Sequence, residues 1–115
     1  MEWIKRPKEL ASVTRRIEVG CGSMYVTVGA NEGKIIEVIA AVGKAGGCAA
    51  AQNEALGRSV SLGLKWGVPL EEYIDQLSGI RCPNPKMFPE KEKCLSCADA
   101  FALALRENGV HEENP

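Results

Sequence analysis

The chain has 115 residues, of which 14 are basic, 15 are acidic and 5 are cysteine. This length predicts a single domain, and the near-zero net charge excludes binding driven by a basic surface, so we expect no nucleic-acid partner and no charge-driven membrane partner. No apolar run approaches the roughly 20 residues that cross a bilayer, and the first residues lack the apolar stretch of a signal peptide, so we expect a cytoplasmic protein.

The first half of the chain predicts three strands. Residues 1–12 are polar and contain Pro7, so we expect an N-terminal arm. Apolar residues then alternate from Val13 to Val19, and again in "SMYVTVG" beyond the glycines on either side of Cys21. The turn residues "ANEG" precede a third β-branched segment, "KIIEVIAAV". The pattern predicts a three-stranded antiparallel meander with Cys21 at the tip of its first hairpin.

Helical periodicity begins at Gly47 and continues to Trp66, before a terminating Gly67. Glu54 and Arg58 have the spacing of an i,i+4 ion pair. One stripe of this helix is apolar, and it consists of Leu56, Val60 and Leu64. A second stripe is small, and it consists of Ala51, Ala55, Ser59 and Gly63. We expect the small stripe to let the helix lie close against the sheet or a partner.

Two further helices are predicted after Gly67. The first spans about residues 69–77, where a proline and acidic residues stand at its start, and Gly79 ends it. An irregular loop follows over residues 80–93. Ser96 then has the position of an N-cap with Asp99 three residues later, a variant of the capping box that opens the third helix. The order predicts an α+β domain over residues 13–108, with a flexible tail over residues 109–115.

The path of this fold brings cysteines that are distant in sequence to one end of the sheet. A disulfide framework is not expected, because cytosolic thiols are kept reduced. Cys21, Cys48, Cys82 and Cys97 are the cysteines that the path brings together. Four thiolates suit a closed, structural zinc site, whereas the lone His111 gives little support to a catalytic one. Separate buried thiols remain an alternative, and Cys94 with Cys97 forms a CxxC that could be a redox pair.

An anion site is a further alternative. The "GKAGG" loop precedes a helix, whose first backbone N–H groups favour negative charge, but it does not match the glycine and lysine order of a P-loop. Such a site would use Gly46 and Gly47 at the helix start, with Lys44, Arg58 or Arg81 as counter-charges. Homo-oligomerisation through the small stripe could build its pocket at an interface.

Four stretches of the sequence carry a family resemblance: "RPKEL", "GCGSMYVTVGANEGKIIEVIAAVGKAGGCAAAQNEALGRSVSLGLKWGV", "LSGIRCPNP" and "LSCADAFALAL". In them the chain resembles the TSCPD domain, a module at the C-terminal end of many adenosylcobalamin-dependent ribonucleotide reductases that also occurs in small stand-alone proteins. The name-giving motif appears here as Leu95-Ser96-Cys97-Ala98-Asp99, with Leu and Ala in place of Thr and Pro. The resemblance places the same four cysteines on the family's recurrent positions and leaves Cys94 outside them.

The resemblance implies a non-catalytic, zinc-binding accessory module in deoxyribonucleotide synthesis, with a ribonucleotide reductase on another chain as its partner. The family context is ribonucleoside-diphosphate reductase, but the radical-forming barrel and cobalamin site of those enzymes need far more than 115 residues. We therefore expect this chain to bind no cobalamin and not to be an enzyme by itself. The alternatives are a stand-alone binder of a nucleotide or small anion, and a thiol oxidoreductase that uses Cys94 and Cys97.

Overall fold

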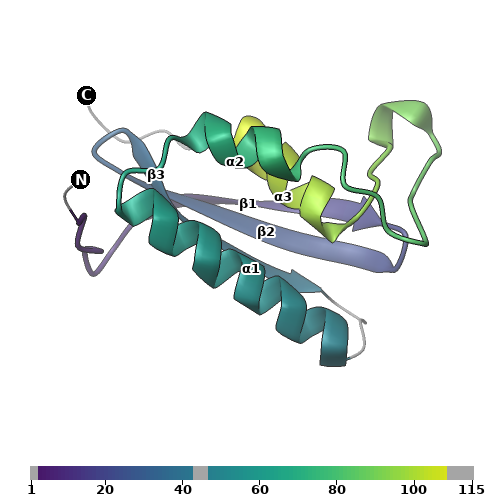
Figure 1. Cartoon of the computed structure of the whole chain (residues 1–115), viewed down its shortest axis with the longest axis horizontal. Helices are drawn as coiled ribbons and strands as arrows, with labels where there is room; N and C mark the ends of the chain where they lie inside the picture. Colours follow the sequence, from purple (N-terminus) through teal and green to yellow (C-terminus); the bar gives the residue numbers. More distant parts are fainter. Residues whose placement is uncertain (1–2, 43–46, 109–115) are drawn as a thin grey trace.

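The computed structural model describes residues 3–42 and 47–108. Its strands are β1 (Ala11–Val19), β2 (Gly22–Asn31) and β3 (Lys34–Val42), which form an antiparallel sheet in the order β1-β2-β3. Its helices are α1 (Gly47–Lys65), α2 (Leu70–Leu77), the short 3-10 helix η1 (Glu90–Glu92) and α3 (Cys97–Arg106) (Figure 1). The predicted meander followed by three helices is confirmed, although the first strand begins at Ala11 instead of Val13.

Both hairpin turns have the short form that the sequence predicts. Gly20 and Cys21 form the first turn, because Val19 pairs directly with Gly22. Glu32 and Gly33 form the second turn, and both have positive φ angles, of 52° and 80°. Two positive φ angles in succession are typical of a type I′ turn, whose twist matches that of the flanking strands. Cys21 therefore lies at the tip of a tight hairpin, where its side chain is exposed.

The hydrophobic core lies between one face of the sheet and helix α3. Alternate residues of β2, including Met24, Val26 and Val28, are buried because strand side chains point to opposite faces in turn. Phe101 of α3 is fully buried in the same cluster. Helix α3 packs across β1 and β2, and α2 packs on α3 (Figure 1). Within the described residues, no helix has the length and apolar character needed to cross a membrane.

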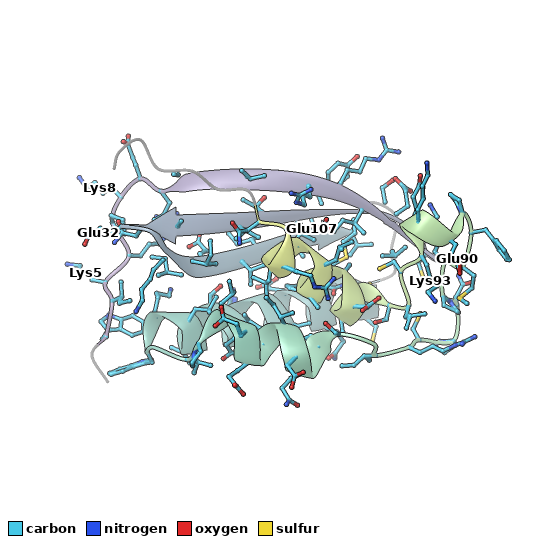
Figure 2. All side chains as sticks on the ribbon, turned by 90° about the horizontal axis from the view of Figure 1, so that it is seen from above. Lys5, Lys8, Glu32, Glu90, Lys93 and Glu107 are labelled. Atoms are coloured by element: carbon cyan, nitrogen blue, oxygen red, sulfur yellow. The ribbon has the colours of Figure 1, made fainter. Side chains whose placement is uncertain are left out.

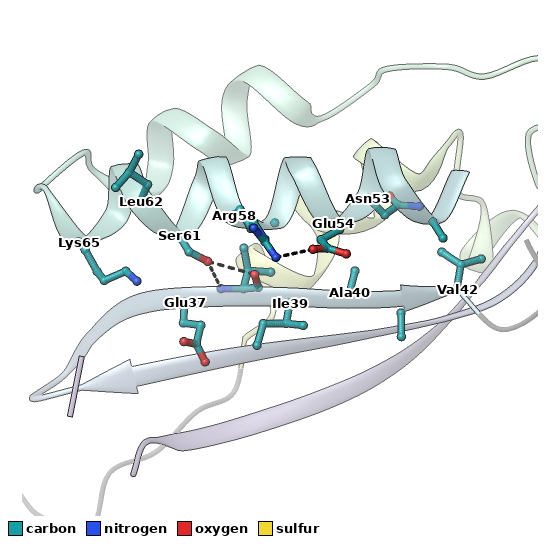
Figure 3. Close-up of a pocket in the computed structure, with 14 residues that line it drawn as sticks. Glu37, Ile39, Ala40, Val42, Asn53, Glu54, Arg58, Ser61, Leu62 and Lys65 are labelled. Atoms are coloured by element: carbon teal, nitrogen blue, oxygen red, sulfur yellow. Dashed lines mark hydrogen bonds and ion pairs between the residues drawn. The ribbon is translucent and has the colours of Figure 1, made fainter. Parts of the chain in front are cut away.

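Helix α1 packs along β3 and contacts its backbone directly. The Ser61 hydroxyl accepts a hydrogen bond from the Val38 N–H at 2.9 Å and donates one to the Val38 carbonyl at 3.1 Å (Figure 3). One helical turn away, a Cβ added to Gly57 would lie 3.1 Å from the Val38 carbonyl oxygen. A small residue and a hydroxyl therefore allow α1 to approach β3 closely and to satisfy backbone groups on its outer edge.

The predicted role of the small stripe against the sheet is wrong. Ala51, Ala55 and Ser59 are exposed, whereas Asn53, Gly57 and Ser61 are buried. At about 100° per residue, Gly57 and Ser61 lie within about 100° of Val60 around the helix, but Ala51 and Ala55 lie roughly 140–180° away. The residues that contact β3 are therefore Gly57 and Ser61, beside the apolar stripe, whereas Ala51 and Ala55 face away from it. Gly63, the fourth residue of the predicted stripe, is half-buried and faces α2, because a Cβ added there would overlap the Tyr73 hydroxyl oxygen.

Substitution of Ser61 tests how much the contact with β3 stabilises the fold. Ser61→Ala leaves a buried N–H and a buried carbonyl without partners, so the free energy of unfolding should fall by about 1–3 kcal/mol. Ser59→Ala makes the same chemical change on the exposed side of α1 and should change it by no more than about 0.5 kcal/mol. Urea unfolding followed by circular dichroism measures both. Equal effects of the two variants would contradict the role assigned to Ser61.

Candidate functional site

The cysteine-bearing segments lie at one end of the molecule. Cys21 forms part of the β1–β2 turn, and Cys48 is the second residue of α1, which begins beside the same end of the sheet (Figure 1). Val42, the last residue of β3, pairs with Met24 near the start of β2. The loop between α2 and α3 reaches this end as well. The predicted convergence of these segments on one end is therefore present. It does not by itself place the four cysteine side chains close enough to share a metal ion.

The loop between α2 and α3 is held by backbone hydrogen bonds around its cysteines. The Cys82 N–H donates to the Leu95 carbonyl at 3.0 Å, and Lys86 and Cys94 exchange two bonds of 2.9 Å. The Asn84 N–H points at the Cys82 sulfur, at 3.4 Å. An N–H directed at a sulfur helps to fix the orientation of that side chain. Cys82 therefore occupies a backbone environment suited to a metal ligand.

Asn84 also connects this loop to the first hairpin. Its side-chain amide donates to the Gly20 carbonyl at 2.9 Å. A Cβ at Gly20 would lie 1.6 Å from the Asn84 carbonyl oxygen, so only glycine fits this approach. Gly20 precedes Cys21 directly, and Asn84 lies two residues after Cys82. The tight contact therefore brings the segments of two of the four predicted ligands together.

The Ser96 and Asp99 side chains fix the start of α3. The Ser96 hydroxyl accepts from the Asp99 N–H at 3.0 Å and donates to the Ile80 carbonyl. The Asp99 carboxylate accepts from the Leu95 N–H at 3.0 Å and from the Gly79 N–H at 2.9 Å. The predicted N-cap is confirmed, and the Asp99 carboxylate accepts from Leu95, one residue before the N–H that it would bond in a standard capping box. This network connects the end of α2 to the helix that begins at Cys97.

Cys94 is chemically distinct from the other cysteines. Its side chain is 1% exposed, and its thiol donates to the Ser96 carbonyl at 3.3 Å. Burial raises the pKa of this thiol above its ordinary value, because the thiolate would lose its solvation. A cysteine that attacks disulfides needs an accessible thiolate. This environment gives no support to Cys94 as the nucleophile of a redox pair.

The predicted zinc ligands do not form a preassembled metal site. Cys21 and Cys48 are exposed, and Cys82 and Cys97 are half-buried. Across residues 3–42 and 47–108, no group of three or more His, Cys, Asp or Glu side chains lies close enough to hold a metal ion. The zinc site is therefore still a prediction, and metal binding there would require these side chains to move toward one another.

The residues predicted for an anion site are only partly described. Lys44 and Gly46 lie outside the described residues, while Gly47 is the first residue of α1. Arg58 lies eleven positions further, about 16 Å along the helix at 1.5 Å per residue. It forms the predicted i,i+4 pair with Glu54, at 2.6 Å. Arg58 is therefore remote from the helix start and already has an ionic partner.

A groove between α1 and β3 was not predicted from the sequence. It has a volume of about 830 Å³, and its lining residues include Ile39, Leu62 and Lys65 (Figure 3). Ile39 is 54% exposed, although it belongs to a strand that is otherwise mostly apolar. The period-two pattern assigns Ile39 to the side of the sheet opposite the core. The strand pattern in the sequence could therefore have identified Ile39 as an apolar side chain exposed on the outer face of the sheet.

Comparisons with known proteins agree with the motifs. A sequence model of the TSCPD domain family matches residues 2–108. A vitamin B12-dependent ribonucleotide reductase from Agrobacterium fabrum is 33% identical over 107 residues, which cover 92% of this chain and 8% of the reductase. The chain thus spans a small part of that relative. No solved structure matches the chain.

The Asp99 carboxylate is predicted to contribute strongly to stability. Asp99→Ala removes two hydrogen bonds to a charged acceptor, so the free energy of unfolding should fall by about 2–3 kcal/mol. Asp75→Ala, on the exposed side of α2, removes an acid without such bonds and should change it by about 0.5 kcal/mol or less. Thermal and urea unfolding provide the comparison. A small effect at Asp99 would show that the capping network does not hold α2 and α3 together.

The five thiols should differ in reactivity toward iodoacetamide. Cys94 should react at least about tenfold more slowly than Cys21, because it is buried and its pKa is raised. The raised pKa in the folded state also makes stability fall as the pH rises through the thiol range, and Cys94→Ala should remove that dependence. Mass spectrometry of peptides from a labelling time course measures the rates. Equal labelling of both cysteines would contradict the inert environment of Cys94.

Proposed function

We propose that the chain, which belongs to the TSCPD domain family, is a non-catalytic, zinc-binding accessory module that acts in a ribonucleotide reductase system. The relative named above is a vitamin B12-dependent ribonucleotide reductase, and the similarity covers nearly all of this chain. That similarity supports a role beside such an enzyme. It does not assign the reaction of the reductase to this chain, because the matched part is 8% of the reductase.

The observation that carries the zinc proposal is the convergence of four cysteine-bearing segments on one end of the fold. The Gly20–Asn84 contact joins two of them, and the Asn84 N–H is directed at the Cys82 sulfur, which helps to fix that side chain. Cys97 begins α3, where the helix N-terminus favours negative charge. Four cysteine thiolates arranged as a tetrahedron form a common structural zinc site. Because the side chains are not preassembled, binding would be coupled to closure of the loop.

Zinc content is the direct test of this proposal. Protein purified without chelator should contain about one zinc per chain, and metal release should expose about four additional thiols. Cys97→Ser should reduce the zinc content several-fold, whereas Cys94→Ser, the matched control from the same CxxC, should retain it. Elemental analysis combined with thiol titration measures these quantities. Wild-type protein without zinc, or equal zinc loss in both variants, would refute the zinc site.

Stability provides an independent reading of the same site. A metal that binds only the folded chain stabilises it by about 2.7 kcal/mol when free zinc is 100-fold above the dissociation constant. That increase should be absent in Cys97→Ser and present in Cys94→Ser. Zinc that raised stability equally in both variants would be bound elsewhere on the chain.

A further inference from the structure

Strand β1 has an outer edge that no other element pairs with. It belongs to a sheet in which β1 neighbours only β2, and it is 9 residues long. Among the described residues, no backbone hydrogen bond joins β1 to any element other than β2. An unpaired edge of this length is a template for another extended segment. The opposite edge of the sheet, on β3, is instead covered by α1.

The contact between Ser61 and Val38 identifies which β1 amides are free. Val38 directs its N–H and carbonyl at Ser61, away from β2, so its neighbour Ile39 must face β2. Ile39 pairs with Thr27, which leaves Val26 and Val28 facing β1. These residues pair with Arg15 and Val13. The backbone groups of Thr14 and Arg16, which alternate with them, therefore point outward.

A groove of about 620 Å³ runs along this free edge. It is lined by residues 13–18 of β1, by Lys86 and residues 91–93 of the loop, and by Leu103 and Glu107. We call it the β1-edge groove. Lys93 and Glu90 project from the loop at one end of the molecule, and Lys5 and Lys8 lie at the opposite end (Figure 2). The groove thus combines unpaired backbone with the side chains of a charged loop.

The β1-edge groove has an excess of uncompensated positive charge. Five of its side chains are cationic, and they are Arg15, Arg16, Lys86, Lys91 and Lys93. Two of its three carboxylates are already engaged, because Glu18 pairs with Arg16 at 2.7 Å and Glu92 pairs with Lys86 at 3.2 Å.

The remaining cations have no carboxylate partner within the part of the chain that the structure describes. Arg15 donates to the Glu107 carbonyl oxygen, and its Nε is buried without a hydrogen-bond partner. Lys91 and Lys93 are exposed and form no ion pair among the described residues. The third carboxylate, on Glu107, offsets one of these three cations, so the five cations and three carboxylates leave an excess of two positive charges, and an occupant should supply negative charge.

We propose that the β1-edge groove binds an extended, acidic peptide segment of a partner protein, which adds to the sheet as a strand beside β1. The outward groups of Thr14 and Arg16 would pair with the peptide backbone. Acidic side chains on alternate positions would face Lys91, Lys93 and Arg15. Backbone pairing then supplies affinity, and the charges select the sequence, as in other strand-addition complexes. The proposal does not require zinc, because none of the groove residues named here is a predicted zinc ligand.

A second copy of this chain fits the edge less well. Antiparallel pairing of two β1 strands with full overlap, which is centred on Arg15, places Arg15 directly opposite its counterpart. Like charges directly opposite each other destabilise a strand pair. The same arrangement brings two loops with Lys91 and Lys93 into the same region. Charge therefore favours an acidic partner over self-association.

The first experiment uses a fluorescein-labelled peptide of alternating valine and glutamate with the length of β1. Fluorescence anisotropy should show binding that weakens with added salt, and a valine–lysine peptide should bind at least about tenfold more weakly. Lys91→Glu combined with Lys93→Glu should weaken binding of the glutamate peptide by about tenfold or more. Lys5→Glu combined with Lys8→Glu makes the same charge change at the far end and should have less than about a twofold effect.

The second experiment distinguishes strand addition from attraction by charge alone. By NMR, the Thr14 and Arg16 amides should exchange with deuterium quickly in the free protein, whereas Val13 and Arg15, paired with β2, should exchange slowly. The glutamate peptide should slow exchange at Thr14 and Arg16 by about tenfold or more. Three results would overturn the proposal: no slowing at these amides, equal effects of the two charge variants, or equally tight binding of an oligothymidylate of the same charge.

Discussion

The pair of hydrogen bonds between Ser61 and the backbone of Val38 holds α1 on the outer edge of the sheet. A three-stranded sheet buries little surface by itself and presents two unpaired edges. Because Ser61 and Gly57 let α1 lie directly on β3, one of these edges is covered by a helix. Because the backbone groups alternate along each paired strand, the same contact also shows which groups of all three strands point outward. The free edge of β1 follows from this arrangement, since no second helix covers it in the described part of the chain.

The Ser96–Asp99 network has a comparable role for the helices. Asp99 accepts from Gly79 and Leu95, and Ser96 donates to Ile80, so the end of α2 and the start of α3 form one hydrogen-bonded unit. The loop between them is long and has few apolar residues to hold it. Its course therefore depends on these polar contacts and on the Lys86–Cys94 bridge. The TSCPD motif of this chain is in this respect a structural cap, whatever further chemistry Cys97 performs.

Much of the fold could be predicted because its signals are local. Period-two alternation gave the strands, and glycines gave the turns and the end of α1, where Gly67 has a φ of 97°. The contact face of α1 could not be predicted in the same way, because two rows of that helix contain small residues. The row that meets β3 is decided by its angular position around the helix axis relative to the buried Val60. Residue size alone does not give that position.

The candidate site was less predictable for a different reason. A path argument can bring Cys21 and Cys82 to the same end of a sheet, but it cannot supply the contacts that hold them. The Gly20–Asn84 contact depends on two segments that are 64 residues apart in sequence. Likewise, the buried environment of Cys94 arises from packing that CxxC spacing does not encode. Spacing therefore indicated the chemistry of the thiols, while their accessibility had to come from the structure.

The loop between α2 and α3 contributes to both proposed binding sites, and this has a thermodynamic consequence. It carries Cys82, and it also carries Lys91 and Lys93 of the β1-edge groove. Lys86 lines that groove and pairs with Cys94, so the two regions share one segment of backbone. A zinc ion that ordered the loop would lower the entropic cost of binding a peptide beside it. Because coupling between two ligands is reciprocal, the peptide would raise the affinity for zinc by the same factor. An accessory module built in this way would bind its partner more tightly when it holds zinc.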